Sequence, residues 1–132
     1  MSVITRRTVA LSLAAAVTAA LAACDRGGLS AEQAANLTGG GVAVRGAEVM
    51  QRFGCGACHA IPGIPGASGQ VGPPLAGVGG RAYIGGVLTN TPDHMVRWIV
   101  NPQAVDSLTA MPNLGVTAGE ARDIAAYLYM RQ

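Results

Sequence analysis

The sequence predicts a small all-α domain whose long loops wrap around something other than protein. Apolar residues recur at helical spacing in three stretches that carry helix-capping residues. No stretch shows a convincing strand pattern. A segment rich in Gly and Pro, from Pro62 to Gly86, separates the first two helical stretches. A compact domain rarely holds so long a segment without secondary structure of its own, which suggests that it encloses a bound group.

Length and charge exclude several other classes of protein. The 132 residues suffice for one domain, and only 12% of them are charged, too few for a charged disordered chain. All nine basic residues are arginines, and two of them lie in the first seven residues, which leaves seven arginines against seven acidic residues. Such a balance offers no basic stripe for nucleic acid, so we expect no nucleic-acid partner.

Residues 1–23 are expected to be a signal peptide that is removed on export. Two consecutive arginines precede an apolar stretch, residues 9–23, which is shorter than the roughly 20 residues of a membrane span. The stretch ends in Leu-Ala-Ala-Cys at residues 21–24, which resembles the bacterial lipobox. Cys24 is then the lipidation site, and its acyl chains would anchor the protein to the periplasmic face of a bacterial membrane. The alternative is an ordinary signal peptide cut nearby; either way, the mature protein works outside the cytoplasm.

A flexible tether is expected to join the lipidated cysteine to the domain, over residues 24–44. Within it, Ser30 and Gln33 form a possible capping box for a short helix that ends near Leu37. The run of three glycines at residues 39–41 then interrupts regular structure. The folded domain is expected to span residues 45–132.

The first of the three main helices is predicted to run from about Val44 to Phe53. Val49, Met50 and Phe53 recur at helical spacing, and Gly54 is a natural stop. With the possible short helix in the tether, the fold would contain three to four helices.

The second and third helices carry clear start signals. Thr91 is a natural N-cap, and Pro92 occupies the first helical position, while the Asn-Pro pair at residues 101–102 ends this helix. Thr117 and Glu120 form a capping box that opens the third helix.

The stretch Cys55-Gly56-Ala57-Cys58-His59 carries the most chemical information. C-x-x-C-H is the attachment signature of c-type haem. Two thiols at this spacing can reach two vinyl groups on one porphyrin edge, and the next residue then points at the iron. A dithiol redox motif would need a βαβ pattern, which is missing. Half a zinc site would need further ligands, and the only other cysteine and histidine are Cys24 and His94.

With these residues in place, the sequence resembles a class I (monohaem) cytochrome c from about residue 46 to residue 130. Four motifs carry the resemblance in the family's order. They are C-x-x-C-H at 55–59, the family's G-P-x-L-x-G-x-x-G-R at 72–81, Trp-Ile-Val-Asn-Pro at 98–102, and Ala-Met-Pro at 110–112, which is followed by a helix with Tyr127.

The resemblance implies a covalently attached haem c and a role for each matching residue. Cys55 and Cys58 would form the thioethers, His59 would be the proximal iron ligand, and Met111 the distal one. A His/Met pair raises the reduction potential, because soft sulfur favours ferrous iron. The Pro73 carbonyl would accept a hydrogen bond from the His59 ring, and Arg81 would bind a haem propionate. Three side chains would pack on the haem: Leu75, Trp98 and Ile99. Gly46 and Tyr127 would let the first and last helices cross closely.

Met111 has several competitors in the sequence for the role of sixth iron ligand. Met111 would lie in a loop, where a core role is less natural, whereas Met50, Met95 and Met130 are expected in helix packing. His94 is the alternative ligand for a bis-His site. The residues before Met111, 106–109, lack the Pro-Gly turn frequent in the family, which leaves the stiffness of this loop open.

The resemblance implies one-electron transfer rather than enzymatic catalysis, since a six-coordinate iron has no open site for a small-molecule substrate. Residues 81–129 are similar to the cytochrome domain attached to bacterial haem-copper oxidases, which favours a donor to a terminal oxidase. A haem subunit that accepts electrons from a periplasmic dehydrogenase is the alternative among redox partners. A haem-based gas sensor, in which the Met111 bond is displaced, is a third. The family's ring of lysines is absent, so docking would rest on apolar contact.

Overall fold

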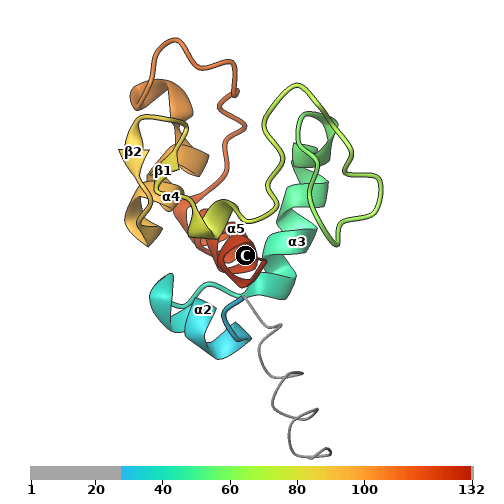
Figure 1. The fold of residues 1–132 in the computed structure, drawn as a ribbon, viewed down its shortest axis with the longest axis vertical. Coiled ribbons are helices and arrows are strands. Elements are labelled where there is room, and N and C mark those ends of the chain that lie inside the picture. Colours follow the sequence, from blue (N-terminus) through green and yellow to red (C-terminus); the bar gives the residue numbers. More distant parts are fainter. Residues whose placement is uncertain (1–27, 132) are drawn as a thin grey trace, which may run out of the picture.

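The computed structural model describes residues 28–131, and in this range the chain is mostly helical (Figure 1). The predicted all-α class is confirmed. The predicted signal peptide and the lipidation site Cys24 lie outside the described residues. The described elements are α2 (Ala31–Leu37), α3 (Ala43–Arg52), α4 (Pro92–Val100) and α5 (Ala118–Met130), single 3₁₀ turns η1 (Cys55–Ala57), η2 (Val78–Gly80) and η3 (Pro102–Ala104), and the short strands β1 (Tyr83–Ile84) and β2 (Leu88–Thr89).

The predicted capping residues begin their helices as expected. Thr117 accepts a hydrogen bond from the backbone N–H of Glu120, and the Glu120 carboxylate accepts from the backbone N–H of Thr117 in return. Ser30 and Gln33 form the same reciprocal pair at α2, and the Thr91 hydroxyl accepts from the N–H of His94 at α4. These bonds satisfy N–H groups that the first turn of a helix leaves without a partner.

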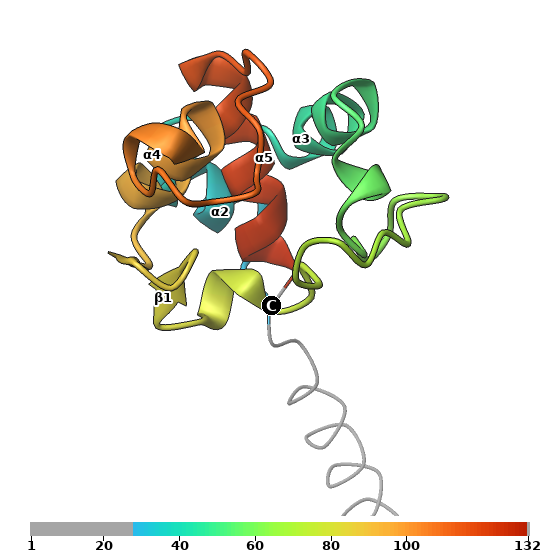
Figure 2. The ribbon, with the colours of Figure 1, turned by 90° about the horizontal axis from the view of Figure 1, so that it is seen from above.

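Helix α5 is the centre of the fold. It contacts α2, α3, α4 and η2, and Figure 2 shows it lying between α3 and α4. All seven residues from Asp123 to Tyr129 are buried, on every side of the helix. A helix buried all round needs partners on all faces, which explains why α5 joins the two halves of the domain.

Helices α3 and α5 cross closely at Gly46. A Cβ at this position would lie 2.1 Å from the Asp123 carbonyl oxygen and 2.9 Å from the Ile124 nitrogen. The Tyr127 hydroxyl, on the same helix, donates to the Pro62 carbonyl at 2.6 Å. The expected glycine contact is present, and Tyr127 holds the start of the long loop to α5.

Asp123 fastens the beginning of α3 to α5. Its carboxylate accepts a hydrogen bond from the Val42 N–H at 2.7 Å and two from the Arg45 guanidinium at 2.9 and 3.0 Å. Val42 has no side-chain cap of its own, so Asp123 caps α3 from another helix. An Arg52–Glu120 ion pair joins the same two helices further along.

Part of the expected tether is packed rather than flexible. Ala34 in α2 is fully buried, Thr38 directly after the helix is 4% exposed, and α2 contacts α5. The Thr38 hydroxyl donates to the Ala34 carbonyl at 2.7 Å, which hides its polar group. Gly41 lies so close to the Arg122 backbone that a Cβ would fall 2.2 Å from its carbonyl oxygen. The glycine run therefore allows close approach as well as a turn.

The long loop between α3 and α4 contains little regular structure, as expected, but it includes a small hairpin that the sequence analysis missed. Strand β1 pairs antiparallel with β2, Tyr83 opposite Thr89 and Ile84 opposite Leu88. Strands of two residues are too short to show a repeating pattern.

Replacing Gly46 with Ala should destabilise the protein, because the added methyl group meets backbone that cannot move aside. We expect a loss of at least about 2 kcal/mol in the free energy of unfolding. Gly119→Ala is the matched control: a Cβ there meets nothing within 4 Å, so this variant should keep or slightly raise the stability. Guanidinium unfolding of both proteins checks this, and equal stabilities would contradict the close crossing.

The Asp123 interactions should make stability depend on acid pH. Burial works to raise the Asp123 pKa, but the hydrogen bonds from Arg45 and Val42 and the Arg45 charge outweigh it, so the pKa is lowered. A carboxyl with a lowered pKa in the folded state stabilises it fully above the unfolded pKa of about 3.9. This contribution is lost as the pH falls through the folded pKa.

Asp123→Asn should therefore be less stable than the wild type at pH 7, and the difference should shrink below about pH 4. Guanidinium unfolding at several pH values measures the difference. The pKa of Glu120 is also lowered, chiefly by its hydrogen bonds with Thr117, which Asp123→Asn leaves in place, so most of the Glu120 contribution is common to the two proteins. A difference independent of pH would contradict the pairing.

Candidate functional site

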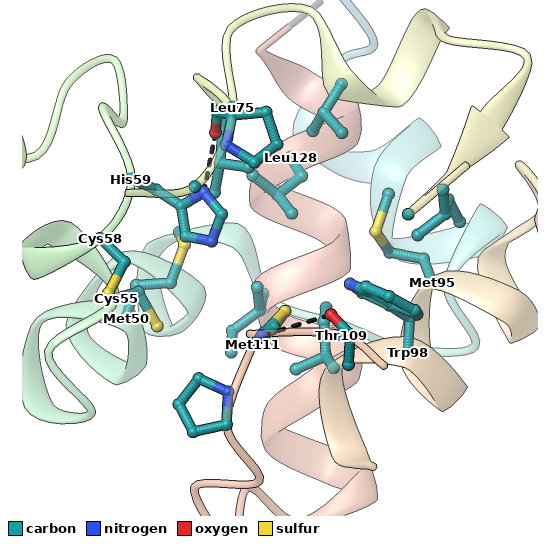
Figure 3. A pocket seen from close by; sticks show the side chains of 18 of the residues that line it. Met50, Cys55, Cys58, His59, Leu75, Met95, Trp98, Thr109, Met111 and Leu128 are labelled. Carbon is teal, nitrogen blue, oxygen red and sulfur yellow. Dashed lines mark hydrogen bonds between the residues drawn. The ribbon is translucent and has the colours of Figure 1, made fainter. Parts of the chain in front are cut away.

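A cavity of about 550 Å³ opens between the α3 side of the molecule and the α4 side, with α5 at its base. Its size lies in the roughly 300–1,000 Å³ range of ligand and cofactor pockets. Every site residue predicted within the described part of the chain lines this cavity: Cys55, Cys58, His59, Pro73, Leu75, Arg81, Trp98, Ile99 and Met111. Residues predicted from four separate motifs thus meet around one space (Figure 3).

One tight turn brings the two cysteines and the histidine to the cavity. Gly54 adopts a left-handed conformation (φ 69°) that ends α3 and starts the 3₁₀ turn η1. The Cys55 carbonyl then accepts from the N–H of both Cys58 (3.3 Å) and His59 (3.0 Å). Both cysteines are free thiols and half-buried, and burial raises the pKa of the Cys55 thiol.

The following loop is hydrogen-bonded to this turn. The Gly69 N–H donates to the Gly56 carbonyl at 3.0 Å, and the Gly72 N–H donates to the Cys58 carbonyl at 2.8 Å. A Cβ at Gly69 would lie 2.4 Å from the Ala57 carbonyl oxygen, so the loop and the turn fit only without a side chain there.

The His59 ring is fixed in orientation and in tautomer. Its Nδ1 lies 2.7 Å from the Pro73 carbonyl oxygen, which can only accept, so Nδ1 must carry the proton. In the neutral ring this tautomer has a free lone pair on Nε2, and neutral imidazole is the form that binds a metal. Gly72 restricts the ring from another side, since a Cβ there would lie 2.3 Å from His59 Cε1.

Arg81 braces the segment that carries Pro73. One guanidinium nitrogen donates to the Pro74 carbonyl at 2.6 Å and to the Ala76 carbonyl at 3.1 Å. The predicted contact with a haem propionate would use the remaining N–H groups.

Asn90 is a positioning residue that sequence reasoning missed. Its amide nitrogen donates to the carbonyls of Val78 (2.8 Å) and Arg81 (2.7 Å), and its oxygen accepts from the Tyr129 hydroxyl at 2.7 Å. Burial raises the pKa of Tyr129 to about 12, so this hydroxyl keeps its proton. Asn90 therefore ties the Arg81 segment to α5. An Asn just before a helix looks like an ordinary loop residue, so no local signal marks it.

The opposite wall comes from α4 and from the segment between η3 and α5. Trp98 packs against the hairpin turn, where a Cβ at Gly85 would fall 2.5 Å from the indole ring. Figure 3 shows Met111 and His59 entering the cavity from different parts of the chain. Met50 and Met95, expected in helix packing, are buried in the core but also line the cavity.

His94 does not lie at the cavity. Its Nδ1 is 2.8 Å from the Thr89 carbonyl oxygen, which directs the ring toward β2, and it is not among the lining residues. The alternative of a second histidine ligand therefore finds no support in this arrangement.

The residues around the cavity fit a haem attached through both thiols. Two free thiols and an imidazole with a free lone pair share one turn, and the rest of the lining is mostly apolar side chains. These are the chemical groups that a porphyrin with an iron requires.

Comparison with known proteins agrees with the geometry. The family model described as cytochrome c matches residues 43–130, two thirds of the chain. The chain belongs to the cytochrome c family. No curated protein and no solved structure matches it.

Membership establishes the general function. A cytochrome c is an electron carrier rather than an enzyme, and its cofactor is a covalently bound haem c, with which the Cys55 and Cys58 pair is consistent. Within residues 28–131, this cytochrome c domain has no helix that is long and apolar enough to cross a membrane.

Proposed function

We propose that this cytochrome c carries single electrons through a class I site with His59 and Met111 as the two axial ligands. The observation that supports this most directly is the hydrogen bond from His59 Nδ1 to the Pro73 carbonyl, at 2.7 Å. It leaves Nε2 as the only ring nitrogen able to bind iron, in a cavity that Met111 also lines.

When bound, the haem supplies an iron that gains and loses one electron. The chain's own residues set the energetics of that exchange. His59 is a strong nitrogen donor whose basicity rises through its bond to Pro73, and Met111 is a soft donor that favours ferrous iron. Leu75, Trp98 and Ile99 keep water away from the ring, and the remaining N–H groups of Arg81 would bind a propionate.

A donor to a terminal oxidase is the partner role that we favour. Exposed apolar side chains surround the mouth of the cavity: Val71 is 80% exposed, Tyr83 58% and Leu114 40%, and all three are lining residues. An apolar rim without lysines suits brief docking through a small contact area, as redox encounters require. A periplasmic dehydrogenase could use the same rim.

The proposed lipid anchor at Cys24 would hold the domain close to a bacterial membrane. Because α2 is already packed on α5, only five residues, 25–29, lie between Cys24 and the N-cap Ser30, which makes six residue-to-residue steps. At about 3.5 Å per residue, the fully extended segment from Cys24 to Ser30 would reach roughly 20 Å. The cavity would then stay near the membrane, where an integral oxidase presents its electron-accepting side.

Met111→Leu should abolish the weak far-red charge-transfer band of the ferric protein, because leucine preserves the volume but offers no sulfur. Absorption spectra of the purified holoprotein measure this. Met95→Leu and Met50→Leu are the matched controls, since both residues also line the cavity, and both variants should keep the band. A band that survives Met111→Leu, or that is lost with Met95→Leu, would assign the sulfur ligand elsewhere.

Ready binding of carbon monoxide by the ferrous wild type would favour the gas sensor.

Cys24→Ser should release the cytochrome from the membrane fraction into the soluble periplasmic fraction, since lipid attachment needs the thiol. Haem staining of both fractions after separation follows the protein. Cys24 is remote in sequence from the haem motif, so the amount of haem-bearing protein should stay the same. Unchanged membrane association of the variant would refute the anchor.

A further inference from the structure

The segment that carries Met111 has little backbone support. Residues 112–117 have no regular secondary structure, and 110–116 make no backbone–backbone hydrogen bond within the described chain. The last such bond before Met111 joins the Thr109 N–H to the Asp106 carbonyl at 3.2 Å. A segment of this kind is expected to open more easily than the helices around it.

Side chains hold the peptide groups of Met111 instead. The Met111 N–H donates to the Thr109 hydroxyl at 3.2 Å, a contact between residues only two apart. The Met111 carbonyl accepts from Gln103 Nε2 at 2.6 Å, across eight residues. Only the second contact joins Met111 to a different structural element.

Gln103 itself belongs to a well-held turn. It lies in η3 directly after Pro102, which is one of the two largest fully buried side chains among the described residues. The Asn101 side chain accepts from the Ala104 N–H at 3.2 Å and so closes the same turn. This turn continues from α4, the helix that supplies Trp98 to the cavity wall. The Gln103 side-chain amide therefore reaches the Met111 carbonyl from a well-held turn.

We propose that Gln103 is a positioning residue that latches the Met111 segment to the end of α4 and so keeps the Met111 sulfur at the iron. The inference rests on the proposed role of Met111 as a ligand. The Pro-Gly turn that is frequent before this methionine in the family is replaced here by Asp106, Ser107, Leu108 and Thr109. A hydrogen bond from the far end of the loop supplies the restraint that a stiff turn would otherwise give.

The latch predicts how easily an external ligand displaces Met111. Imidazole can bind the ferric iron only after the Met111 segment has opened, so its apparent affinity reports the opening equilibrium. Gln103→Leu removes the donor and should tighten imidazole binding roughly three- to tenfold, the effect of losing one hydrogen bond. Gln103→Glu keeps the shape but turns an oxygen toward the Met111 carbonyl, and should tighten binding at least as much.

Gln51→Leu is the matched control. Gln51 is exposed on α3, and its side chain makes no hydrogen bond within the described residues. Imidazole titrations of the ferric holoproteins should therefore give the wild-type dissociation constant for this variant. Because Gln103 is also exposed, neither substitution at that position should prevent folding, and equal thermal unfolding midpoints would verify this.

The possible results separate the latch from the axial ligation. Equal imidazole affinities in the wild type, Gln103→Leu and Gln103→Glu, with the far-red band present in all three, would refute the latch and leave Met111 as the ligand. A wild-type protein without that band would refute the ligation, and the latch with it. Tighter binding in both Gln103 variants, with Gln51→Leu unchanged, would support the latch.

Discussion

The arrangement of the whole domain depends on one turn, Cys55 to His59, that presents two thiols and an imidazole to the same space. Because the turn fixes where a porphyrin edge and its iron must lie, the opposite wall has to stand one ring away rather than in direct contact. The cavity of about 550 Å³ is the result. Helix α5 holds the two walls together despite this gap, since it is buried on all sides and contacts both α3 and α4 at the base of the cavity.

Besides backbone hydrogen bonds, side chains bonded to backbone carbonyls hold the loops around the cavity. Arg81 binds two carbonyls of the segment that carries Pro73, Asn90 binds the segment that carries Arg81, and Gln103 binds Met111. Each of these side chains donates to backbone carbonyls in a stretch with little secondary structure, where those carbonyls would otherwise lack partners. A rigid iron site can thus be built largely from loops, at the cost of depending on a few polar side chains.

Local features of the sequence predicted much of this structure. Capping residues such as Thr91 and Thr117 act within one helical turn, and the cysteine spacing acts within five residues, so both are visible without the fold. The bonds of Asn90 and Gln103 were not predictable, because they depend on where carbonyls of other segments point. Part of the tether expected over residues 24–44 is packed on the domain, at α2 and the residues after it. Gly41 resembled a linker residue, and only the structure shows the Arg122 backbone beside it.

The most direct test of the account is the mass of one tryptic peptide from protein made in a host that attaches c-type haem. Trypsin cuts after Arg52 and Arg81, which leaves Phe53 to Arg81 as a single peptide with both cysteines of the motif. The account predicts that this peptide carries one haem through two thioether bonds and absorbs visible light. A colourless peptide with two free thiols, or with a disulfide between them, would contradict it.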